Sequence, residues 1–282
     1  MKKLFCNNTL RLVILLIVFT AAGLFCWSYI DAAHGIRVRE IWYGFVIGVS
    51  LILIVLFRKS VSLKDVLIGL LFGLMCVPRA LPKYPSATTV YMLGVYFDKA
   101  YIPFIMSVIP AYIASMAVFK NSDNKIYLFK NGRKHVLLKT VLWIVIAGGI
   151  LAALECIRGI ATDVRPVFNF STTAVAVGLE TGFFEEVFFR MFLFALCVFV
   201  TRGAKLTRLQ SILCYLIMLI PHTLAHFSPQ WIVYKPLVVL IMAVKMLPMA
   251  IAQRRNNLAS SVGIHALSNT VIFIVLGVVQ TI

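Results

Sequence analysis

Acidic residues are scarce in this chain of 282 residues, where ten Asp and Glu stand against 27 Lys and Arg. Charged residues make up only 13% of the sequence, whereas about 25% is typical of soluble domains. Hydrophobic residues make up 61%. The composition therefore argues against an ordinary soluble enzyme and predicts an all-α fold, a polytopic membrane helical bundle with about eight or nine transmembrane helices.

Several hydrolase signatures are also missing. The sequence has no His-Glu-x-x-His motif of a zinc protease and no Gly-x-Ser-x-Gly turn of a serine hydrolase. Only one Asp, Asp65, lies in an expected span, which argues against a paired-aspartate protease. The six cysteines include no Cys-x-x-Cys pair, so neither a disulfide framework nor a zinc ribbon is expected.

Apolar runs divide the chain into expected spans of about 20 residues, the length that a bilayer requires. The first run extends from Arg11 to about Ile30, which is long for a signal peptide and predicts a retained helix. The further expected spans are Ile41–Phe57, Val61–Val77, Ile102–Phe119, Val136–Cys156, Ser171–Val200, Leu209–Ile220, Trp231–Ala252 and Leu258–Thr281.

The excess of basic residues is explained by membrane topology rather than by nucleic acid. With nine spans and the N-terminus inside, most of the 27 Lys and Arg fall on the inner side, as the positive-inside rule requires. We therefore expect a multi-pass protein of the cell membrane with a cytoplasmic N-terminus, a lipid bilayer as partner and no nucleic acid. The basic Lys120–Lys139 loop divides the chain, and the expected units are N-terminal transmembrane helices at 1–157 and a catalytic core at 158–282.

Three of the ten acids lie within seven residues of one apolar run, Glu180, Glu185 and Glu186. A charge at the centre of a spanning helix costs roughly 2.5–3.5 kcal/mol on insertion scales. Glu186 and Arg190 are i,i+4 neighbours on one helix face and can offset this cost by pairing. Glu185 points about 100° away, so it is free for chemistry; a purely structural ion-pair cluster is the alternative. Glu180 is interpreted as a channel-lining or helix-start residue.

Two further pairs of polar residues, each with at least one histidine, stand in later apolar segments. His222 and His226 are spaced i,i+4 at the end of one span, and His265 and Asn269 have the same spacing in the last span. Ionisable and polar residues in spanning helices normally face the bundle interior or a wet cavity. A desolvated carboxylate can act as a general base near neutral pH, histidines can orient water, bind a metal or stabilise an oxyanion, and Asn269 can donate to a developing oxyanion.

The order of these motifs resembles the CPBP (Abi) family of intramembrane proteases, which includes the CAAX prenyl protease 2 enzymes of eukaryotes. The resemblance covers roughly Ser171 to Val275. It implies that Glu185 is the catalytic base and that Glu186 with Arg190 supports it. It also matches His226 to the family's Phe-x-x-x-His motif, and His265 and Asn269 to the last motif. The implied substrate is a membrane-associated or lipidated peptide or protein, in peptide maturation or bacteriocin self-immunity.

The chain departs from the family at His222, which replaces the Phe of the Phe-x-x-x-His motif. The extra histidine could simply cap its helix near Pro221, or it could raise the chance of a metal. A divalent metal such as zinc, held by His226 and His265, and a water-only mechanism are both open. Lys245 is expected to extend toward the inner surface.

A simple arrangement, called here the simple ladder, in which nine straight helices cross the membrane one after another, raises a geometric difficulty. It places His226 near the outer face and His265 in the inner half, too far apart to share a water at 1.5 Å per residue. Pro221 and Pro229 fall between two expected spans and Pro236 lies near the start of the second, so we expect this segment to be irregular and to dip into the bundle. Two other functions use the same residues: a proton-coupled transporter with a Glu and His relay, and a non-catalytic immunity or scaffold protein.

Overall fold

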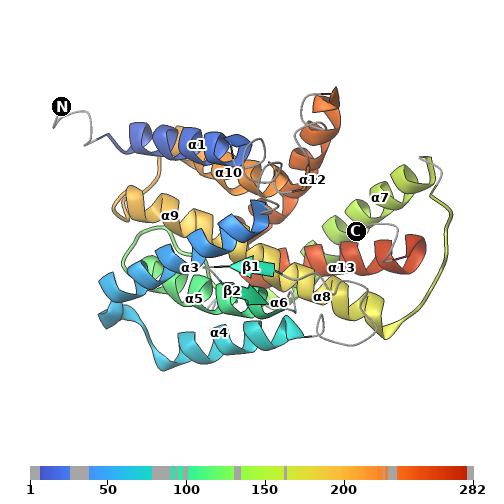
Figure 1. Cartoon of the computed structure of the whole chain (residues 1–282), viewed down its shortest axis with the longest axis horizontal. Coiled ribbons are helices and arrows are strands. Elements are labelled where there is room, and N and C mark those ends of the chain that lie inside the picture. Colours follow the sequence, from blue (N-terminus) through green and yellow to red (C-terminus); the bar gives the residue numbers. More distant parts are fainter. Residues whose placement is uncertain are drawn as a thin grey trace.

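The structure is a computed structural model that describes residues 7–25, 38–77, 90–92, 95–97, 101–129, 135–161, 164–224, 226–227 and 234–277. Helices account for nearly all of its regular elements (Figure 1). In chain order these elements are α1 (Asn8–Phe25), α3 (Val38–Leu56), η3 (Arg58–Ser60), α4 (Leu63–Met75), β1 (Val90–Met92), β2 (Val95–Phe97), α5 (Tyr101–Lys120), α6 (Val136–Trp143), η5 (Ile144–Gly148), α7 (Gly149–Ala161), α8 (Thr172–Glu185), η6 (Glu186–Met191), α9 (Phe192–Val200), α10 (Arg208–Leu224), α12 (Pro236–Arg255) and α13 (Leu258–Leu276).

The predicted all-α membrane bundle is confirmed as the fold class. Two three-residue strands, β1 and β2, add a small antiparallel hairpin with Tyr91 opposite Tyr96. Within the described residues, three helical segments are long and apolar enough to cross a membrane: Val136–Ala161, Pro236–Arg255 and Leu258–Leu276. Shorter apolar helices lie at Asn8–Leu24, Trp42–Leu56, Ile105–Lys120 and Arg208–Leu224.

The expected spans agree with the helices except in length. The segment expected at Val61–Val77 forms α4, whose 13 residues rise about 20 Å and so fall short of a hydrocarbon core of about 30 Å. The helix starts there because Ser62 and Asp65 form a reciprocal capping box. Residues 26–30, 231–233 and 278–281 of the expected spans lie outside the described residues. The number of spans, the cytoplasmic N-terminus and the division at residue 157 stay predictions.

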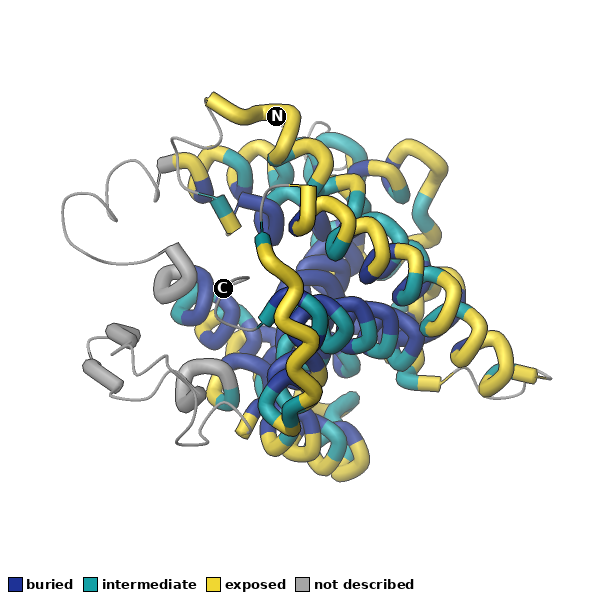
Figure 2. Tube along the Cα trace, turned by 90° about the vertical axis from the view of Figure 1, so that its right-hand side faces the viewer, coloured by how far each residue is buried: buried dark blue, intermediate teal, exposed yellow. Residues whose placement is uncertain are grey.

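The segment α8–η6–α9 is one continuous helix through the centre of the molecule. Every residue from Glu186 to Val198 is buried, as expected for a helix that is surrounded on all sides. The main hydrophobic core gathers around it from α1, α3, α5 and α10. Figure 2 shows the buried residues in the interior, with exposed residues on the outer helices.

The outer faces of these helices are apolar, which suits a lipid environment. Leu51, Ile52, Val55 and Leu56 of α3 are all more than half exposed, and α12 exposes Leu237, Leu240, Ile241 and Val244. Exposed apolar residues along whole helix faces are unusual on soluble monomers. These faces therefore suit contact with lipid.

Two glycines allow α8 and α13 to pack backbone to backbone, as they do side by side in Figure 1. A Cβ atom added to Gly178 would lie 2.7 Å from the backbone N of Thr270, and one added to Gly182 would lie 2.9 Å from that of Ala266. These glycines are spaced as Gly-x-x-x-Gly, a common interface motif in membrane helices. This close approach sets His265 of α13 beside the acidic residues at the end of α8.

Replacing Gly178 with Ala is expected to destabilise the protein by about 1–3 kcal/mol, because the added methyl group overpacks the α8–α13 contact. The measurement is thermal or denaturant unfolding in detergent. Gly48→Ala in α3 is the matched control, since a Cβ atom there meets nothing within 4 Å and Ala favours a helix over Gly. Equal stability of the two variants would contradict the packing argument.

Candidate active site

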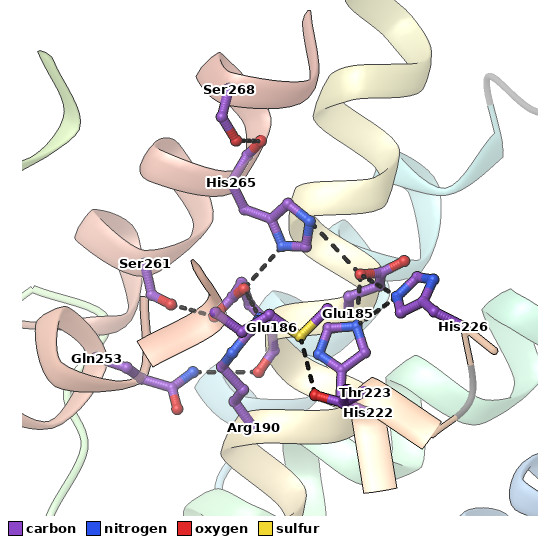
Figure 3. Close-up of polar contacts among 11 residues, drawn as sticks. Glu185, Glu186, Arg190, His222, Thr223, His226, Gln253, Ser261, His265 and Ser268 are labelled. Atoms are coloured by element: carbon purple, nitrogen blue, oxygen red, sulfur yellow. Dashed lines mark hydrogen bonds and ion pairs between the residues drawn. The ribbon is translucent and has the colours of Figure 1, made fainter. Parts of the chain in front are cut away.

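The two adjacent glutamates lie where the central helix changes its hydrogen bonding. α8 ends at Glu185, and η6 is a π-helical segment from Glu186 to Met191. Such segments are rare and occur often at functional sites. The side chains of Glu185 and Glu186 consequently contact different sets of partners (Figure 3).

The carboxylate of Glu186 lies in a closed polar cluster. Arg190 forms the predicted ion pair with it, and both side chains are fully buried. The hydroxyl of Ser261 donates to its Oε2 atom, and Nδ1 of His265 lies 2.8 Å from its Oε1 atom. Glu186 therefore ties the central helix to α13 and orients the His265 ring.

The backbone of Glu186 also has a partner from another helix. The side chain amide of Gln253 on α12 donates to the Glu186 carbonyl oxygen at 3.1 Å. A change from α- to π-helical bonding leaves a carbonyl without its usual amide, and a buried carbonyl needs a donor. Gln253 thus stabilises the irregular turn that separates the two carboxylates.

The carboxylate of Glu185 faces three imidazole rings. Its Oε2 atom lies 2.7 Å from Nε2 of His222, 3.5 Å from Nε2 of His265 and 3.9 Å from Nε2 of His226. The side chain of Glu185 is 14% exposed and that of His226 is 31% exposed. The site is therefore largely buried but can be reached from the side of His226.

The structure corrects the simple ladder, which separated His226 from His265. Both rings lie within 4 Å of the same Glu185 oxygen (Figure 3). α10 ends at Leu224, and His226 follows in a turn in which its backbone N–H donates to Thr223. The irregular segment that we expect between α10 and α12 falls mostly on residues 228–233, outside the described residues.

Three other predicted residues have different outcomes. Asn269 is partly buried one turn beyond His265, and among the described residues it makes no hydrogen bond with the two glutamates or the three site histidines. Glu180 is buried on α8. The prediction that Lys245 extends to the inner surface is wrong: its Nζ atom lies 3.1 Å from Glu155 of α7, and its side chain is only 16% exposed. A carboxylate on a neighbouring helix allows a lysine to remain inside.

His222, for which a helix cap was one of two interpretations, is the site histidine that the structure places closest to Glu185. Its ring is fully buried and stacks on Phe189, with centroids 4.4 Å apart and planes 5° from parallel. The i,i+4 spacing to His226 was the signal for this contact. Ser261 and Gln253 carried no local signal, because only the packing of α12 and α13 brings them to Glu186.

The arrangement combines a reachable carboxylate with several nitrogen groups in a desolvated setting. A carboxylate can take a proton from water, and neutral imidazoles can donate a hydrogen bond, accept one or ligate a metal. Electrostatic stabilisation of charge is stronger where water is excluded. The geometry is therefore suited to activating a water molecule for hydrolysis.

Comparison with known proteins relates part of the chain to a protease family. Residues 167–271 match the model of a family described as type II CAAX prenyl endopeptidase, Rce1-like. The matched region contains all of the predicted site residues, and the resemblance predicted from the sequence is thus confirmed for this part of the chain. The match is to a family of membrane proteases. No match was found among curated proteins or among solved structures.

Proposed function

We propose that this chain, whose residues 167–271 match the type II CAAX prenyl endopeptidases, is an intramembrane endopeptidase. It hydrolyses a peptide bond of a membrane-associated or lipidated peptide, in peptide maturation or bacteriocin self-immunity. The observation that carries the proposal is the Glu185 carboxylate, which faces three imidazoles in a largely buried site.

In the proposed mechanism Glu185 takes a proton from a water molecule held by His226 and His265. The resulting hydroxide attacks the scissile carbonyl carbon and forms a tetrahedral oxyanion. Asn269, with a histidine, donates hydrogen bonds to the oxyanion. Glu185 then returns the proton to the leaving amine as the C–N bond breaks, so that the carboxylate is regenerated.

Glu186 and Arg190 support this chemistry without touching the substrate. The ion pair holds a second carboxylate in place, and that carboxylate contacts Nδ1 of His265. A neutral His265 that donates its Nδ1 proton to Glu186 presents the lone pair of Nε2 toward Glu185. It is then oriented to accept a hydrogen bond from the attacking water.

The test is cleavage in proteoliposomes that contain the purified protein and a peptide tethered to the membrane by a lipid or an apolar segment. Mass spectrometry should find two new termini at one peptide bond, with wild-type protein and not with empty vesicles. Flux of protons or solute without cleavage would instead support a transporter. Tight peptide binding without cleavage would support a non-catalytic immunity or scaffold protein.

Asn269→Ala is expected to lower kcat for the tethered peptide by about 10²–10³-fold, the typical loss when an oxyanion donor is removed. KM should change little, because the oxyanion exists only in the transition state. Asn169→Ala, which changes an Asn in the segment between α7 and α8, is the control. An unchanged kcat in Asn269→Ala would remove Asn269 from the mechanism.

A further inference from the structure

Three potential metal-ligating atoms converge in the site: Oε2 of Glu185, Nε2 of His222 and Nε2 of His226. The glutamate lies 2.7 Å from His222 and 3.9 Å from His226, and the two ring nitrogens are 3.1 Å apart. In a tetrahedral zinc site with bonds of about 2.0–2.1 Å, neighbouring ligand atoms lie about 3.3–3.4 Å apart. The three observed separations bracket this value.

Proton counting shows why a cation suits this cluster. A neutral imidazole carries one N–H group, and Nε2 of His222 lies within hydrogen-bonding distance of both Glu185 and His226. One proton on this nitrogen can point to Glu185, but it leaves no lone pair there for a hydrogen bond from His226. A metal ion instead lets the carboxylate oxygen and both nitrogens direct lone pairs at one point.

The surroundings preorganise the three ligands. Stacking on Phe189 fixes the ring plane of His222, and Phe189 belongs to the π-helical segment that also positions the glutamates. Nδ1 of His222 is buried without a hydrogen-bond partner among the described residues. Stacking therefore replaces the hydrogen bond that usually orients a ligating histidine.

We propose that Glu185, His222 and His226 bind a divalent transition metal of the zinc class. Two imidazoles and one carboxylate suit zinc, and catalytic zinc sites keep a fourth position open for water. His265 lies on the other side of Glu185, 3.5 Å from its Oε2 atom, and its ring centroid is 6.4 Å from that of His222. His265 is not one of the three proposed ligands and would stay available to orient a water molecule.

Only the catalytic role of the metal rests on the proposed function. The binding of the metal does not. If an ion were bound, Glu185 would be one of its ligands, and the metal would lower the pKa of the water that the carboxylate and the histidines otherwise activate without it. The histidine that departs from the family's Phe-x-x-x-His motif gives this chain its third ligand. His222→Phe restores the family's residue and so distinguishes a mechanism with a metal from the mechanism that uses Glu185 and the histidines without one.

The experiment is metal analysis of purified protein after equilibration with Zn²⁺ and removal of excess metal, with Co²⁺ substitution and absorption spectroscopy as a second readout. Wild-type protein should retain one Zn²⁺ per chain and show the intense visible bands of tetrahedral Co²⁺. His222→Phe should lose at least about a hundredfold in affinity, more than the loss of an outer partner costs. His135→Asn, which removes a histidine at the start of α6, should bind as wild type does.

His226→Gln provides a second variant at the more exposed edge of the site, in case His222→Phe does not fold, and it should show the same loss. Wild-type protein without stoichiometric metal, or full binding by the folded variants, would overturn the metal proposal. Cleavage by metal-free protein would leave the proposed function standing and the metal proposal refuted. Stoichiometric metal without cleavage of the tethered peptide would support the metal proposal and refute the proposed function.

Discussion

Cleavage is expected to be lost when Glu185 is replaced with Gln. The amide keeps the size of the side chain, but it cannot take a proton from water and is a much poorer metal ligand. Removing a general base typically lowers kcat by about 10²–10⁴-fold. Initial rates on the tethered peptide in proteoliposomes measure the loss, with correct insertion checked by gel filtration in detergent.

Glu155→Gln is the matched control, because the side chains of Glu155 and Glu185 are each 14% exposed. Glu155 pairs with Lys245 and Arg158 rather than with the site histidines. Its variant should cleave at a rate close to that of wild type. Activity that survives in Glu185→Gln would show that this carboxylate is not the base, and the proposed mechanism would fail.

The largest effect on stability is expected for Arg190→Met. This change leaves the fully buried Glu186 without its cation, and breaking a buried ion pair from one side typically costs about 3–5 kcal/mol. The double variant Glu186→Gln with Arg190→Met should be more stable than Arg190→Met alone, because no uncompensated charge remains. Denaturant unfolding in detergent, followed by tryptophan fluorescence, measures both.

Arg158→Met controls for the loss of an arginine from an apolar segment. Arg158 is 58% exposed and pairs with Glu155 three residues earlier, and exposed pairs contribute at most about 1 kcal/mol. If Arg190→Met unfolded at the same denaturant concentration as Arg158→Met, the Glu186–Arg190 pair would not stabilise the bundle.

Local features of the site could be predicted from the sequence because they depend on spacing along one helix. Glu186 and Arg190 stand four residues apart, so a helix brings them together whatever surrounds it. The scarcity of acids made Glu185 conspicuous, and the low charge content indicated the membrane bundle. A bound metal or a substrate leaves no comparable local pattern in this chain.

The distances between helices were decided only by the tertiary structure. The pattern of apolar residues in α10 does not show how this helix packs against the central helix. It therefore does not show that His222 lies closer to Glu185 than His226 does. The Gly178 and Gly182 contacts bring α13 against α8, so that the His265 ring lies between the two adjacent carboxylates. The sequence by itself determined which ionisable groups are available within the membrane. Packing between distant helices decided which of them meet, because such contacts depend on the shapes of both surfaces and on neither helix alone.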